Sequence, residues 1–368
     1  MSYEQRAKEK QDALIASGRA TVLAIESSCD ETACAIVRNG REVLSNTVHT
    51  QIPLHRKYGG VVPELASRNH VERIGAVVET ALTDADMTLQ EIDAIAVTCG
   101  PGLVGALLVG VSYAKGLAPG LVGALLVGVS YAKGLALSHD LPLIGTNHIL
   151  GHIAANYLTF PDLEPPFTCL IASGGHSHIV RVEDYDRCTL IGRTRDDAAG
   201  EAFDKVARVL GLPYPGGPEL EKLAKDGDPK AIRFRSAFNE REDEYDMSFS
   251  GLKTAVINVL HTSEQRGETI NRADVAASFQ YEVISILSDK AVRAASDTLA
   301  LAGGVSANAA LRNMLARKSQ KKGIRFCCPD FKYCTDNAAM IGSAGYYLLM
   351  KGHRDGLDLN ATPYLSVV

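Results

Sequence analysis

The sequence lacks a paired cysteine pattern. Its eight cysteines include no C-x-x-C pair. A chain of 368 residues can bury a core large enough to fold without disulfides. We therefore expect reduced thiols and, from the length, two compact lobes.

The sequence also has no excess of positive charge. Its formal net charge is −5, and wrapping nucleic acid by bulk electrostatics needs a concentrated basic surface, so that class of protein is excluded. Any contact with RNA must be local. The candidate patch is a basic run, a pattern that is also typical of solvated helix ends: Arg317, Lys318, Lys321, Lys322 and Arg325.

Neither a leader peptide nor a membrane span is expected from the sequence. The first twenty residues have no apolar h-region and carry Glu4, Glu9 and Asp12, so they are neither a secretory signal nor an acid-poor transit peptide. The longest apolar stretch is interrupted by Pro119-Gly120 and by two lysines, which leaves each run too short to cross a bilayer. We expect a cytoplasmic protein with no membrane contact.

A tandem repeat stands inside that apolar stretch. Residues 101–118 read PGLVGALLVGVSYAKGLA, and residues 119–136 repeat the same eighteen letters. Solenoids need at least three copies, and their copies diverge, so a single identical pair indicates a recent duplication, an engineered insertion or an error in the assembled sequence. Because Pro119-Gly120 makes one continuous helix unlikely to form, we predict two helical segments, one in the native position and one extruded.

The remaining pattern predicts an α/β protein with two similar halves. Strands are expected at Thr21 to Glu26, Ala33 to Val37 and Glu42 to Val48, an antiparallel opening around the Asn39-Gly40 turn. Strands then alternate with helices. Further strands are expected at 92–98, 141–144, 167–172, 178–182, 189–193 and 298–301, and helices at 62–82 and around Val275, Phe279, Val283 and Leu287. The predicted parts are an extension 1–20, a first lobe 21–146, a second lobe 147–350 whose last helix returns toward the first, and a tail 351–368.

Two histidines have the spacing of a metal site. His148 and His152 lie at i and i+4, which on a helix places both imidazoles on one face. Unrelated surface histidines would show the same spacing. Asp336 would complete a two-histidine, one-carboxylate set suited to iron or zinc, although an aspartate there is equally typical of a helix cap.

Glycine-rich turns mark candidate phosphate contacts. The segments Gly200-Glu201, Pro215-Gly216-Gly217 and Gly303-Gly304 stand at predicted helix starts, where backbone N–H groups and the helix dipole favour anions. Ser173-Gly174-Gly175 joins two predicted strands, and its paired glycines permit close approach to a phosphate or carboxylate, although a tight hairpin would show the same pattern. No Walker A lysine motif is present. Asp30 and Glu31 follow the first strand and are candidates for orienting a reacting group, or simply a charged turn.

With these segments assembled, the chain resembles the universal tRNA threonylcarbamoyladenosine transferase family, called TsaD in bacteria and once described as O-sialoglycoprotein endopeptidase. The resemblance covers about Val22 to Gly345. Its motifs are ESSCDET from Glu26, YGGVVPELASRNH from Tyr58, GPGLVGALLVG from Gly100, NHILGH, SGGH, GEAFDK, YPGGP, SFSGLKTA and GGVSAN.

The resemblance implies a two-lobed actin-like (ASKHA) fold and the transfer of threonylcarbamoyl from its adenylate to N6 of the adenosine next to the anticodon, in tRNAs reading ANN codons. It implies one divalent ion, iron(II) or zinc, on His148, His152 and Asp336, and an orienting role for Asp30 and Glu31. It implies as partners tRNA, a paralogous ASKHA protein and a small ATPase. The implied adenylate-binding residues are Ile171, Ala172, Ser173, Gly174, Gly175, Asp204, Gly217, Glu221 and Asn308.

The sequence departs from the family in two places. Glu221 stands where aspartate is common, and the helix before the strand leading to His148 is duplicated. Three alternatives therefore stay open: an ASKHA small-molecule kinase, a folded scaffold that the duplication has inactivated, and a metalloprotease. The last is disfavoured because H-x-x-x-H lacks the glutamate of H-E-x-x-H.

Overall fold

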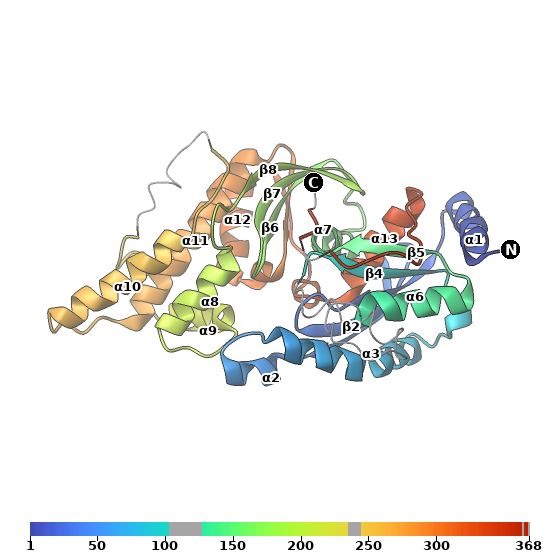
Figure 1. Ribbon diagram of the computed structural model, residues 1–368. Coiled ribbons are helices and arrows are strands. Elements are labelled where there is room, and N and C mark those ends of the chain that lie inside the picture. Colours follow the sequence, from blue (N-terminus) through green and yellow to red (C-terminus); the bar gives the residue numbers. More distant parts are fainter. Residues whose placement is uncertain (103–126, 235–243, 363, 367–368) are drawn as a thin grey trace. The chain divides into compact units, whose positions relative to one another are not determined.

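The computed structural model describes residues 1–102, 127–234, 244–362 and 364–366. They form two compact units, each with a five-stranded sheet (Figure 1). The first unit contains Met1–Glu164, Asp184–Arg187 and Thr335–Val368. The second contains Pro165–Glu183 and Cys188–Cys334.

The sheet of the first unit has the order β3-β2-β1-β4-β5. Its strands are β1 (Thr21–Glu26), β2 (Glu31–Arg38), β3 (Glu42–Thr50), β4 (Ala94–Gly100) and β5 (Leu143–Asn147). The first three strands pair antiparallel, whereas β1, β4 and β5 pair parallel. The predicted antiparallel opening is confirmed, and the parallel pairs follow from the helices that connect them.

Helices cover both faces of this sheet. They are α1 (Tyr3–Ser17), α2 (Ile52–His55), α3 (Pro63–Asp84), α6 (Val127–His139), α7 (His148–Thr159) and α13 (Ala338–Met350), with short 3-10 turns η1 (Arg56–Tyr58) and η2 (Leu89–Glu91). Leu23 and Ile25 belong to a core with residues of α3 and α6. Ala24 faces the other way, toward α13. Strands buried on both sides read as continuous apolar runs, as β1 does.

Two glycines let α13 approach the sheet closely. A Cβ on Gly342 would lie 2.7 Å from Cγ2 of Val37, and one on Gly345 would lie 2.5 Å from Cβ of Ala96. Those separations are shorter than van der Waals contact, so a larger residue at either position would push the helix away from β2 and β4. The helix that begins just after Asp336 is thereby fixed against the centre of the sheet.

The predicted N-terminal extension is a docked helix. The hydroxyl of Tyr3 on α1 donates to the carbonyl of Leu141 at 3.0 Å, and Gln11 Nε2 donates to the carbonyl of His353 at 2.9 Å. The carbonyl of Gly18, which ends α1, accepts from the hydroxyl of Tyr346 at 2.8 Å. These contacts join α1 to the loop before β5 and to the chain around α13.

The described helix of the repeat region, α6, comes from the second copy. Residues Val127 to Ala136 make up most of α6, which packs on β4 and buries Val127, Val129, Ala132 and Ala136. The end of the second copy therefore occupies the position that leads into β5. Residues 103–126 lie outside the described part of the chain, so the prediction of an extruded helical segment stays a prediction.

The sheet of the second unit has the order β10-β9-β6-β7-β8. Its strands are β6 (Phe167–Ala172), β7 (Ser177–Asp184), β8 (Arg187–Arg193), β9 (Thr298–Ala302) and β10 (Arg325–Cys327). Its helices are α8 (Ala199–Val209), α9 (Gly216–Ala224), α10 (Ser250–Gln265), α11 (Arg272–Ala294) and α12 (Ala309–Lys321), with 3-10 turns η3 (Gly304–Ala307) and η4 (Phe331–Tyr333).

The predicted apolar face of α11 is the centre of this unit. Val275, Phe279, Val283 and Leu287 are each 0% exposed and share one core with the helices α8 to α10. The ring of Phe279 meets that of Phe203 edge-on, at 5.4 Å between centroids. The spacing prediction for this helix is confirmed.

The boundary between the units differs from the predicted one. The second lobe was predicted to begin at residue 147, but α7 belongs to the first unit. The physical reason is local: Asn147 ends β5 and caps α7, so the helix follows the strand without a linker, and α7 packs against α13. No helix in the described part of the chain is long and apolar enough to cross a membrane.

Candidate functional site

His148 and His152 occupy the first turns of α7. The side chain of Asn147 accepts the backbone N–H of Ile149 at 2.8 Å, a helix N-cap that starts α7 at His148. The two imidazoles then lie one turn apart, with ring centroids at 4.6 Å. The prediction that the i, i+4 spacing places both rings on one helix face is confirmed.

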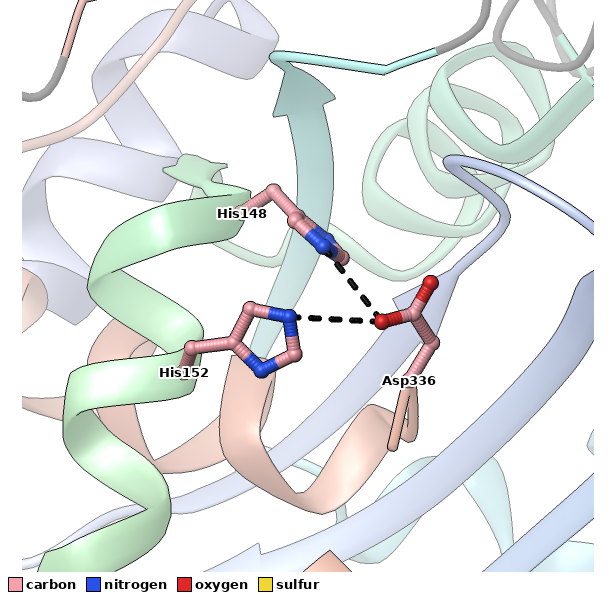
Figure 2. A group of neighbouring side chains, drawn as sticks. All are labelled: His148, His152 and Asp336. Atoms are coloured by element: carbon pink, nitrogen blue, oxygen red, sulfur yellow. Dashed lines mark ion pairs between the residues drawn. The ribbon is translucent and has the colours of Figure 1, made fainter. Parts of the chain in front are cut away.

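Asp336 reaches these histidines from the segment before α13. Figure 2 shows both imidazoles pointing at its carboxylate. The distances from Asp336 Oδ1 are 3.5 Å to His148 Nε2 and 3.3 Å to His152 Nε2. One ligand atom from each residue lies within 4.8 Å of the others. A tetrahedral ion held at about 2.1 Å separates its ligands by about 3.4 Å, so the spacing suits one ion.

The environment of the three side chains also suits a cation. Burial lowers the pKa of His152, and the neighbouring His148 lowers it further, so its ring is neutral as a metal ligand must be. His152 Nδ1 is buried without a hydrogen-bond partner among the described residues. Burial alone would raise the pKa of Asp336, but both histidines outweigh it and keep the carboxyl ionised.

Asp30 and Glu31 form a second acidic group near this site. Glu31 begins β2, and its carboxyl accepts from the hydroxyl of Thr50 at 3.1 Å. Burial raises the pKa of Glu31 to about 10, with further contributions from the carboxylates of Asp30 and Asp336 and from a hydrogen bond to Asp30. Glu31 therefore carries a proton at neutral pH and is hydrogen-bonded to Asp30.

This protonation has a measurable consequence for Glu31→Gln in the metal-free protein. The ordinary pKa is 4.5 and the folded value about 10, so between these values the folded state binds more protons and its stability falls as pH rises. Glutamine keeps an acceptor for Thr50 and cannot ionise. We expect the Tm of the variant, relative to wild type, to increase from about pH 5 to about pH 9.

The matched control is Glu79→Gln, at an exposed glutamate on α3. Its Tm difference from wild type should stay constant over the same pH range. A constant difference for Glu31→Gln would show that this carboxyl ionises normally. Differential scanning fluorimetry in the presence of a chelator measures both.

A buried histidine supports the turn that carries Asp30. Burial lowers the pKa of His70 to about 4, so its ring is neutral. Nε2 then donates to the carbonyl of Cys29 at 3.0 Å, and Nδ1 accepts from the hydroxyl of Thr32 at 2.7 Å. In the sequence His70 is only the last letter of the YGGVVPELASRNH motif, and this role was not predicted because no neighbouring residue shows which turn the ring contacts.

The second unit contains a cavity of about 160 Å³. Five of the predicted binding residues line it: Gly174, Asp204, Gly217, Glu221 and Asn308. Phe203 and Val305 form apolar walls of the cavity and were not predicted as binding residues. Phe203 is part of the GEAFDK motif, and this motif was the signal in the sequence that could have identified it. The helices α8, α9 and α12 all begin near these residues, as the glycine-rich turns predicted.

The other predicted binding residues do not line the cavity. Ile171 and Ala172 are 0% exposed in β6. The Ser173 hydroxyl accepts from the backbone N–H of His176 at 3.1 Å, which closes the turn containing Gly175. These four residues shape the strand and turn that present Gly174.

The polar lining residues are held by the helix starts. Asp204 Oδ1 accepts from the backbone of Gly216 at 2.8 Å and Gly217 at 3.2 Å. Glu221 accepts from the backbone of Ala309 at 2.8 Å, and Asn308 caps α12 by accepting from Leu311 at 2.9 Å. Each of these three side chains therefore accepts a hydrogen bond from the start of a helix and also lines the cavity.

Comparisons with known proteins agree with this arrangement. A model of the TsaD family, described as tRNA N6-adenosine threonylcarbamoyltransferase, matches residues 42–118 and 117–343. The chain belongs to the TsaD family. The break between the two matched segments falls where the first copy of the repeat ends, as expected if the family has a single copy.

The relatives cover nearly the whole chain. A tRNA N6-adenosine threonylcarbamoyltransferase of Clostridium perfringens (strain SM101 / Type A) is 56% identical over 350 residues, which are 94% of this chain and 98% of the relative. The protein of the same name from Clostridium botulinum (strain 657 / Type Ba4) is also 56% identical, over 94% of this chain and 97% of its own length.

Solved structures show the fold alone. The (R)-2-hydroxyglutaryl-CoA dehydratase component A of Acidaminococcus fermentans has a TM-score of 0.51 at 14% identity and covers 90% of this chain and 99% of its own. HypF of T. kodakarensis has a TM-score of 0.56 at 13% identity and covers 89% of this chain and 47% of its own. The predicted actin-like (ASKHA) class is confirmed.

The basic run lies on α12 and the residues after it. Arg317, Lys321 and Lys322 are exposed, whereas Lys318 pairs with Asp289 at 2.7 Å. Lysines in the last turn of α12 also complement the helix dipole. Contact of this surface with RNA stays a prediction.

Proposed function

We propose that this chain transfers the threonylcarbamoyl group from threonylcarbamoyl-adenylate to N6 of the adenosine next to the anticodon, in tRNAs reading ANN codons. Membership of the TsaD family, which acts on tRNA, carries the proposal. In the reaction the N6 amine attacks the carbamoyl carbon, a C–N bond forms, the C–O bond to phosphate breaks, and AMP leaves with the electron pair. The amine proton passes to a base.

His148, His152 and Asp336 would hold one divalent ion, iron(II) or zinc, because the spacing of the three side chains and the neutral ring of His152 suit it. When bound, the ion supplies a Lewis acid for a carbonyl or phosphate oxygen. The protein contributes the orientation of the ligands: α7 fixes both imidazoles, and the close packing of α13 fixes the segment that carries Asp336.

Asp30 and Glu31 would orient the attacking amine. Glu31 is protonated at neutral pH and bonded to Asp30, so Asp30 is the group of the pair that accepts a hydrogen bond or a proton from the amine. The hydrogen bonds of His70 to Cys29 and Thr32 keep this turn in place.

The cavity of the second unit would hold the adenosine part of the donor. Phe203 and Val305 offer apolar surface for a base, and Asp204, Glu221 and Asn308 offer polar atoms for a ribose. We further propose that the chain works with a paralogous ASKHA protein and a small ATPase, as the family resemblance implies.

The test is nucleoside mass spectrometry of unmodified tRNA after incubation with threonylcarbamoyl-adenylate, the two partners and metal-loaded chain. A second chain lacks one copy of the repeat; because the copies are identical, removing either one gives the same protein. Formation of threonylcarbamoyladenosine by both chains supports the assignment. Formation by the shortened chain alone means that the duplication impairs a genuine transferase. No product from either chain contradicts the proposal.

A further inference from the structure

Glu26 is a buried carboxylate that the proposed chemistry does not use. It is the last residue of β1 and 0% exposed. An ionised side chain at such a position is costly unless several donors satisfy it. The hydrogen-bond donors around Glu26 therefore indicate its role.

Three donors from three different segments surround this carboxylate. Oε1 accepts from the backbone N–H of Ser28 at 2.5 Å. Oε2 accepts from the hydroxyl of Thr98 on β4 at 2.6 Å and from His148 Nδ1 at 3.0 Å. The first two contacts hold the carboxylate in the sheet, and the third reaches the metal-binding helix α7.

The contact with Glu26 determines which nitrogen of the His148 ring keeps its hydrogen. A carboxylate accepts and does not donate, so the imidazole keeps a hydrogen on Nδ1, and Nε2 is the nitrogen left for a metal ion. Nε2 is the atom that faces Asp336. A carboxylate behind a metal-binding histidine in this way fixes its tautomer and its orientation and raises its basicity.

The two histidines differ in this respect. His148 Nδ1 contacts Glu26 and also lies 3.0 Å from the hydroxyl of Ser28, whereas His152 Nδ1 has no partner within the residues that the structure describes. Only one ring of the pair is thus held from behind. The orientation of the His148 ring is therefore fixed before an ion binds.

We propose that Glu26 is a positioning residue that holds the imidazole of His148 in its metal-binding tautomer and thereby sets the affinity of the site for its ion. The inference rests on the proposed metal site. It assigns to the first letter of the ESSCDET motif a role different from that of Asp30 and Glu31, which belong to the same motif but do not contact His148 in any described hydrogen bond.

The test compares metal affinity and stability in the full chain. Dissociation constants for Zn²⁺ and Co²⁺ are measured by chelator competition, the Co²⁺ absorption spectrum reports the ligand field, and Tm is measured without metal. Glu26→Gln removes the charge behind His148, and we expect about 10- to 100-fold weaker binding with a changed Co²⁺ spectrum. If that variant does not fold, Glu26→Asp, which keeps the charge but shortens the reach, takes its place with the same expectation.

Thr98→Val is the matched control. It removes one hydrogen bond from the same buried carboxylate and leaves the contact to His148. We expect a lower Tm with metal affinity within about threefold of wild type, because a lost hydrogen bond costs about 1 kcal/mol of stability. Equal weakening in Thr98→Val and Glu26→Gln would mean that affinity follows stability, which overturns the inference.

The two hypotheses fail in different ways. If Asp336→Ala abolishes binding but Glu26→Gln binds within about threefold of wild type, the metal site stands and the role of Glu26 is wrong. If the wild-type chain itself binds neither ion, the metal site and this inference are both wrong.

Discussion

Alanine at Asp336 is expected to abolish stoichiometric metal binding and to lower the rate of threonylcarbamoyl transfer about a thousandfold or more. The carboxylate is the one anionic member of the described ligand set and the point on which both imidazoles converge. A metal ion contributes several kcal/mol to stabilising developing charge, and about 4 kcal/mol corresponds to a factor of a thousand. Metal analysis and single-turnover assays measure the two effects.

Two further variants test whether both effects come from the loss of the carboxylate of Asp336. Asp336→Asn keeps the size of the side chain but loses its charge, and we expect metal binding between that of wild type and alanine. Asp12→Ala removes an exposed carboxylate on α1 and should change neither quantity. Full metal content in Asp336→Ala would show that the ion binds elsewhere or not at all.

Valine at Gly217 is expected to weaken the binding of AMP by about 100-fold, with little change in Tm. Gly217 lines the cavity of the second unit, and a Cβ there would have Cβ of Phe203, 4.0 Å away, as its nearest neighbour. The fold has room for the first carbon of the new side chain, but the ligand would have to compete for the cavity. A steric cost of about 3 kcal/mol corresponds to the expected factor.

The chain offers a closely matched control for this substitution. Gly251 is the second residue of α10, as Gly217 is of α9, and a Cβ on it would meet nothing within 4 Å. Gly251→Val therefore repeats the change in helix propensity without entering the cavity. Isothermal titration with AMP should separate the two variants. Equal affinity in both would exclude this cavity as the nucleotide site.

Much of the fold could be predicted because its strands and central helix are buried on more than one side. The apolar runs at β1, β6 and β9, and the apolar stripe of α11, leave a strong periodic signal. Helix α1 and strand β10 were not predicted. The helix carries no clear apolar stripe and is held by individual hydrogen bonds from Tyr3 and Gln11, while β10 has only three residues.

The candidate site likewise has features that the sequence pattern predicts and features that it does not. The pairing of His148 with His152 follows from the helical repeat, since residues four apart share a face whatever surrounds them. Asp336 is remote in sequence, and the pattern alone offered it as a third ligand or as a helix cap; the resemblance to a known family favoured the ligand. The cavity walls at Phe203 and Val305 come from helices whose packing the sequence pattern does not specify.

The sequence by itself determined the family, the local structure of the metal-binding helix and the alternation of strands and helices. Each of these depends on neighbouring residues or on motifs that are continuous in the chain. Only the tertiary structure decided that α7 belongs to the first unit, that Glu31 is protonated, and that Glu26 lies behind His148. Burial and hydrogen bonding between remote segments produce these properties, because the surroundings of a charge are set by every segment that packs against it.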